Sequence, residues 1–130
     1  PSWKFCVVRN PYSRIVSFYT WCKRIKKFDN ITFEEFVKKS FNKGRARGAW
    51  NLQKDYMVDL EGNNLIDKVF RFESLSTDIP QYFNIQKKFP HLNKSTEIDF
   101  REFYNRELQE IVYHRLIKDF RHLNYNFELE

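Results

Sequence analysis

An arginine and a serine near the N-terminus have the residue types and spacing needed to hold a phosphate-like anion. They are Arg9 and Ser17 in the stretch VVRNPYSRIVSFY, which covers residues 7–19. The planar guanidinium of arginine can bind a phosphate through two parallel, charge-assisted hydrogen bonds. A serine hydroxyl can add another donor to the same group. In a basic chain such a pair also arises by chance, so the elements around it decide its meaning.

The pair is expected to lie where a strand passes into a helix. Residues 3–8 form an almost continuous apolar run, which predicts a strand buried on both faces in a parallel sheet. Asn10-Pro11 ends this strand, and Pro11 suits the first turn of a helix. Arg9 would then stand at the carboxyl end of a parallel strand, where α/β folds bind ligands. The apolar stripe of the helix comprises Ile15, Phe18, Tyr19, Cys22 and Ile25.

Start signals place further helices along the chain. Thr32 followed by Glu35 is the pattern of a capping box. Asp99 and Asn105 have the character of N-caps before a long C-terminal helix. The apolar stripe of that helix comprises Leu108, Ile111, Val112, Leu116, Phe120 and Leu123.

The remaining segments predict a domain with many helices and few strands. We expect a short helix over residues 50–58, a second strand over residues 65–72 and a helix over residues 80–88, with Pro80 near its start. Two parallel strands cannot cover their own faces and edges. We therefore expect the chain to be the later part of a larger α/β domain, or to complete its sheet with a partner.

Composition and charge limit the class of protein. With 130 residues and 42% hydrophobic content, the chain has enough apolar material for a single globular domain over residues 1–130. It contains no run of about 20 apolar residues that would cross a membrane. Cys6 and Cys22 are expected to be buried thiols, and no metal site is expected.

The positive charge is concentrated in the first third of the chain. Residues 1–47 hold 12 Lys and Arg against 3 Asp and Glu, a net charge of +9. Residues 48–130 hold 11 against 14, a net charge of −3. This distribution favours an anionic ligand near the N-terminus, although a solvated basic face would give the same count.

The stretch around Arg9 and Ser17 resembles the 3′-phosphate-binding motif of a family of carbohydrate-type sulfotransferases. These enzymes use 3′-phosphoadenosine 5′-phosphosulfate (PAPS) and are known from Golgi and bacterial members. Three more segments resemble the family in its order along the chain: LQKDYMVDLEGNNLIDKVFRFESLSTDI (residues 52–79), FPHLNKST (residues 89–96) and IKDFRHLNYNFE (residues 117–128). Together the four segments span nearly the whole chain.

The resemblance implies an α/β sulfotransferase fold, similar to that of P-loop NTPases, with a parallel sheet that is incomplete here. It implies that Arg9 and Ser17 hold the 3′-phosphate of PAPS, or of the product 3′-phosphoadenosine 5′-phosphate (PAP). Lys94 and Ser95 would contact phosphate from a loop over the nucleotide. The implied acceptor is a carbohydrate hydroxyl, and no nucleic acid partner is expected. The compartment would be the cytoplasm for a bacterial member and the Golgi lumen for a eukaryotic one.

The chain departs from the family pattern at two places. The strand and Lys- and Gly-containing loop that grip the reacting 5′-phosphosulfate are missing, and residues 44–48 do not replace them because their order and position differ. That lysine would neutralise the leaving phosphate, so this chain should bind half of the cofactor and catalyse poorly. Ala49 stands before Trp50 where many relatives have a histidine base. We assign no catalytic residue.

Two alternatives to a sulfotransferase remain compatible with the sequence. One is a non-catalytic module that binds polyanions such as sulfated glycans or nucleic acid through the basic first third of the chain. The other is a truncated, inactive relative of the family. Arg14 is interpreted as structural. For Arg71 and Glu73 two roles stay open, because they could face the ligand crevice or fix the end of their strand.

Overall fold

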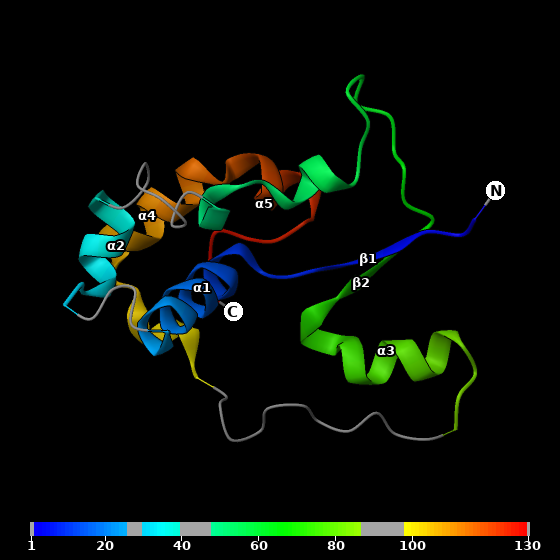
Figure 1. The fold of residues 1–130 in the computed structure, drawn as a ribbon, viewed down its shortest axis with the longest axis horizontal. Helices are drawn as coiled ribbons and strands as arrows, with labels where there is room; N and C mark the ends of the chain where they lie inside the picture. The colour runs from blue at the N-terminus through cyan, green and yellow to red at the C-terminus, as the bar shows by residue number, and fades with distance from the viewer. Residues whose placement is uncertain (1, 26–29, 40–47, 87–97, 130) are drawn as a thin grey trace.

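The computed structural model describes residues 2–25, 30–39, 48–86 and 98–129. Its described part is α/β, with a small parallel sheet of two strands and otherwise mostly helical structure. The α-helices α1, α2, α4 and α5 gather beyond the carboxyl ends of the strands, while α3 runs back beneath them (Figure 1). No helix in these ranges has the length and apolar content needed to cross a membrane.

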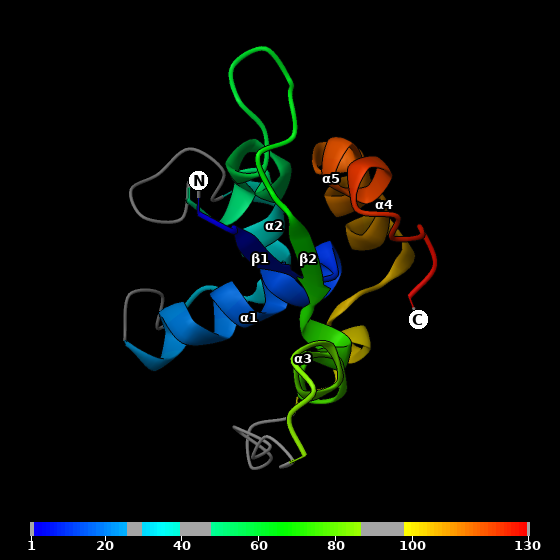
Figure 2. The same cartoon turned by 90° about the vertical axis from the view of Figure 1, so that its right-hand side faces the viewer.

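The two strands, β1 (Phe5–Val8) and β2 (Lys68–Arg71), pair in parallel. Phe5 lies opposite Lys68, and Val8 lies opposite Arg71. Figure 2 shows the pair nearly end-on, with the two strands side by side. The prediction of two parallel strands is confirmed, and both strands are shorter than expected.

The prediction that β1 is buried on both faces is wrong in this structure. Phe5 is 50% exposed and Val7 is 41% exposed, whereas Val8 is buried. A strand with one hydrogen-bonded neighbour has an open edge, so its side chains lack the cover that a wider sheet would give. Trp3 and Phe5 instead stack on each other, and Trp3 also stacks on Tyr82 of α3 (Leu75–Tyr82).

The first helix, α1 (Pro11–Arg24), begins where the sequence predicts. Asn10 is its N-cap and accepts a hydrogen bond from the Tyr12 amide at 2.9 Å. Pro11 occupies the first helical position. The inward face of α1 packs into the main core, which comprises Tyr12, Ile15, Val16, Tyr19, Phe33, Phe36, Val37, Ala49, Trp50, Leu108, Val112, Leu116 and Phe120.

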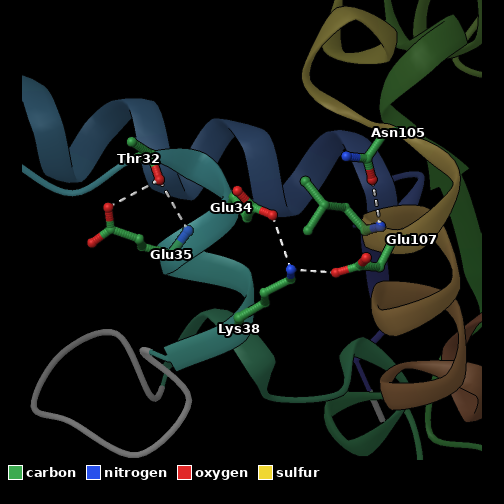
Figure 3. Close-up of polar contacts among 7 residues, drawn as sticks. Thr32, Glu34, Glu35, Lys38, Asn105 and Glu107 are labelled. Atoms are coloured by element: carbon green, nitrogen blue, oxygen red, sulfur yellow. Dashed lines mark hydrogen bonds and ion pairs between the residues drawn. The ribbon is translucent and has the colours of Figure 1, made fainter.

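Helix α2 (Phe33–Lys39) begins with one of the two hydrogen bonds of the predicted capping box. The Thr32 hydroxyl accepts a hydrogen bond from the Glu35 amide at 3.1 Å (Figure 3). The Glu35 carboxylate contacts the Thr32 hydroxyl at 3.4 Å. Lys38 then joins two helices, because it pairs with Glu34 of α2 and with Glu107 of α4.

The long C-terminal helix is divided into α4 (Arg106–Arg115) and α5 (Ile117–His122). Asn105 caps α4, as predicted, and accepts a hydrogen bond from the Leu108 amide at 2.8 Å. Asp99 caps the 3-10 helix Phe100–Phe103 that precedes it. The break lies at Leu116, and Leu108, Val112, Leu116 and Phe120 of the apolar stripe are all buried in the main core.

Two predicted helices differ from those observed. Residues 50–58 do not form an α-helix and hold the 3-10 helix Gln53–Tyr56. Pro80 lies inside α3, near its C-terminal end, so the helix begins five residues earlier than expected. α3 follows directly from the 3-10 helix Phe72–Ser74, and the Ser74 hydroxyl donates to Asp78 in its first turn. This earlier start means that Pro80 removes one internal hydrogen bond of α3.

The Asn105 cap provides a test of the fold. Replacing Asn105 by Ala should lower the free energy of unfolding by about 1 kcal/mol, because the Leu108 amide loses its acceptor. Urea unfolding measures this change. Asn126→Ala is the matched control, since that side chain is exposed, and it should change stability by less than about 0.5 kcal/mol. Equal stability of the two variants would contradict the role of Asn105.

Candidate functional site

The backbone of Arg9 is held on both sides by one side chain. The Arg9 amide donates to Gln53 Oε1 at 2.9 Å, and the Arg9 carbonyl accepts from Gln53 Nε2 at 2.8 Å. Gln53 is fixed in turn, because its own amide donates to Asp119 Oδ2 at 2.8 Å. Asp119 is fully buried in α5 and also accepts from the Lys54 amide at 3.0 Å. A buried carboxylate of the C-terminal segment therefore positions the end of β1.

The start of α1 is held by a second carboxylate. The Asn10 amide donates to Glu73 Oε2 at 3.0 Å, and the Tyr125 hydroxyl donates to Glu73 Oε1. Burial raises the pKa of Tyr125, so its hydroxyl keeps its proton at neutral pH. Glu73 thus joins the end of β2 to the start of α1 and to the C-terminal segment. This is the structural role considered for it from the sequence.

The side chain of Arg9 leaves part of its guanidinium available. Nε donates to Ser13 Oγ at 2.8 Å, and the guanidinium carbon lies 4.1 Å from the centre of the Phe72 ring. The parallel register explains this stacking, because Arg9 follows β1 as Phe72 follows β2. Burial lowers the pKa of Arg9, with Glu73 acting in the opposite direction, and the group stays charged at neutral pH. No described residue forms a hydrogen bond with its Nη1 or Nη2.

Arg9 and Ser17 line the same open pocket. Its volume is about 290 Å³, and its other lining residues are Arg14, Phe18 and Trp21. We call it the α1 pocket, because every described lining residue except Arg9 belongs to that helix. The two residues singled out by their spacing are therefore brought together, with two guanidinium groups and one hydroxyl on the walls. Such a set of donors suits an oxyanion.

The other candidate residues either lie outside the described residues or do not line the α1 pocket. Lys94 and Ser95 lie outside the described residues, as does His91. Arg71 does not line the α1 pocket. Its Nη2 donates to the carbonyls of Leu123 at 2.8 Å and Asn124 at 3.2 Å, so it ties β2 to the C-terminal segment.

The described residues provide no general base beside the pocket. Ala49, the residue at the position where the resemblance would place a histidine, is 1% exposed and belongs to the core. His114 lies on the exposed side of α4, next to Tyr113, and His122 is exposed at the end of α5. None of these side chains lines the α1 pocket.

Sequence reasoning missed the residues that position Arg9. Gln53 and Asp119 belong to two of the resembling segments, and the sequence assigns no role to either of them. One signal was present, because Asp119 lies three residues after Leu116 and four before Leu123 on the buried stripe of α5. A carboxylate on a buried face must find hydrogen-bond donors. Here the donors are two backbone amides.

Comparison with known proteins gives little further information. No protein-family model and no solved structure matches the chain. An uncharacterized protein of Archaeoglobus fulgidus is 46% identical over 37 residues, which is 28% of this chain and 31% of that protein. A match of this extent does not assign the chain to a family.

The Gln53 bonds give a test of how the site is supported. Replacing Gln53 by Ala leaves the amide and carbonyl of Arg9 without partners and should lower the free energy of unfolding by about 1–3 kcal/mol. Gln81→Ala, on an exposed position of α3, is the control and should be nearly neutral. Urea unfolding measures the free energy of unfolding of both variants. If Gln53→Ala does not change it, water replaces both hydrogen bonds and Gln53 is not needed to hold Arg9.

Proposed function

We propose that this chain is the C-terminal part of a PAPS-dependent sulfotransferase domain with the α/β fold of that family. The observation that carries the proposal is that Arg9 and Ser17, which match the family's 3′-phosphate motif, line one pocket at the carboxyl end of β1. The Nη1 and Nη2 atoms of Arg9 are not engaged by described residues and can donate to a phosphate.

In the proposed reaction, an acceptor hydroxyl, implied to belong to a carbohydrate, attacks the sulfur of PAPS. A new S–O bond forms, the bond from sulfur to the 5′-phosphate oxygen breaks, and PAP leaves. The hydroxyl proton passes to a base that we do not assign. Arg9 and Ser17 contribute by anchoring the nucleotide so that the reacting atoms are aligned. Lys94 and Ser95 are proposed as further phosphate contacts.

A polyanion-binding module is the second candidate function. It is favoured by the net charge of +9 on residues 1–47, which would attract a sulfated glycan without any specific pocket. The two functions differ in their response to salt and to a small nucleotide. Binding of a polyanion falls steeply as salt rises, and a mononucleotide bisphosphate does not compete for it efficiently.

Thermal unfolding of the 130-residue chain with and without PAP tests the sulfotransferase proposal. A ligand present at 100 times its Kd should stabilise the folded chain by about 2.7 kcal/mol. We expect PAP to raise Tm at both low and high salt, with Arg9→Ala losing most of this shift and Ser17→Ala losing part of it. For each variant the shift is the difference between its Tm with PAP and its Tm without PAP, so the effect of the substitution on stability cancels.

Arg24→Ala is the matched control for charge. Arg24 lies at the exposed C-terminal end of α1, and its removal changes net charge by the same amount. PAP should raise the Tm of this variant as much as that of the wild type. A shift that Arg9→Ala and Arg24→Ala reduce equally, and that disappears at high salt, would favour the polyanion-binding module instead.

A further inference from the structure

A second arginine of the α1 pocket has unsatisfied hydrogen-bonding capacity. Arg14 lines the pocket with Arg9 and Ser17, and it lies on the same face of α1 as Ser17 and Trp21 because residues three, four and seven apart are neighbours on a helix. Its Nη1 is buried and has no hydrogen-bond partner among the described residues. Its Nη2 donates to the Gly48 carbonyl at 3.4 Å, which is long for such a bond.

The charge of Arg14 is not neutralised by a contact with a carboxylate. No ion pair joins it to an acidic residue in the described part of the chain. Asp119 acts on it at longer range, but both Asp119 oxygens accept from the amides of Gln53 and Lys54. Burial lowers the pKa of Arg14, the effect of a charge removed from water. A half-buried cation whose donor has no acceptor among the described residues would be stabilised by an anion that reaches it.

The pocket itself indicates what that ligand would be. The described residues on its walls include two guanidinium groups and no acidic side chain. Phe18 and Trp21 form the apolar part, with ring centres 5.9 Å apart, and Trp21 is 44% exposed. Two adjacent positive charges favour a doubly charged oxyanion over a singly charged one. The aromatic wall favours an anion that carries a flat ring.

We propose that Arg14 is a ligand-binding residue of the α1 pocket and that Arg9 and Arg14 together select a doubly charged phosphate monoester over a singly charged ester. The guanidinium of Arg14 turns toward the pocket when the anion binds, which the long bond to Gly48 permits. This inference rests on the anion pocket of the proposed function. It does not require that the ligand be PAP or that the chain transfer a sulfuryl group.

Phenyl phosphate and phenyl sulfate form a matched pair of probes. Both carry the same ring, but phenyl sulfate has one negative charge at any working pH. A phosphate monoester loses its second proton near pH 6, so phenyl phosphate has two charges at pH 7.5 and close to one at pH 5. Titrations followed by the indole N–H resonance of Trp21 report Kd at the pocket itself. The wild type should bind phenyl phosphate roughly tenfold tighter than phenyl sulfate at pH 7.5, and this preference should shrink at pH 5.

Variants distinguish a specific role of Arg14 in binding from a general effect of positive charge. Arg14→Gln should lose the preference for phenyl phosphate at pH 7.5, while Arg24→Gln, with the same change of charge on the same helix, should keep it. Arg14→Lys should keep part of it, because an ammonium retains the charge but not the planar pair of donors. Thermal unfolding confirms that each variant is folded before titration.

The outcomes distinguish this inference from the proposed function. If Arg14→Gln keeps the preference while Arg9→Ala loses binding, Arg14 is structural and the inference is wrong. If the wild type binds phenyl phosphate and phenyl sulfate equally well at pH 7.5, the inference is wrong whatever the variants do. If the preference depends on Arg14 but PAP does not displace phenyl phosphate, the inference stands and the sulfotransferase proposal fails.

Discussion

The paired hydrogen bonds between Gln53 and the backbone of Arg9 are the interaction on which the candidate site depends. A strand of four residues in a sheet of two strands has little intrinsic rigidity. The end of β1 is therefore fixed from outside the sheet, by an amide side chain that a fully buried carboxylate, Asp119, holds in place. Glu73 does the same for the first turn of α1. Together these contacts place one guanidinium at a defined point above the strand ends.

Unlike the turn at Arg9, the two-stranded sheet is poorly covered by other described residues. Several large apolar side chains of the strands and their flanks are exposed in the described structure, including Trp3, Phe5, Val7, Val69 and Phe72. The aromatic contacts of Trp3 with α3 cover part of this surface. A wider parallel sheet would cover more of it, since parallel strands are normally shielded on both faces. Completion of this sheet by further structure, which the sequence leads us to expect, stays a prediction.

The sequence predicts helix starts correctly, because the interactions that set them are local. Asn10-Pro11, Thr32 and Asn105 each mark the start of a helix, because a cap satisfies amides within three residues of it. Features of the fold that depend on contacts between distant residues are not predicted in this way. The break at Leu116, the helix start before Pro80 and the exposure of β1 follow from packing that periodicity does not encode. Arg9 and Ser17 could be paired by their spacing, but Gln53 and Asp119 join segments 44 and 66 residues apart, and no pattern in the sequence connects them.

The span of these contacts also bears on when the site can form. Tyr12 donates to the Phe127 carbonyl across 115 residues, Tyr104 donates to the Tyr12 carbonyl across 92, and Asp119 reaches Gln53 across 66. Contacts between distant residues form late in folding, because closing long loops costs entropy before the contact returns any energy. During synthesis, the first helix emerges from the ribosome well before the residues that anchor it. The turn that carries Arg9 would thus acquire its final geometry only after the C-terminal helices have been made and have docked.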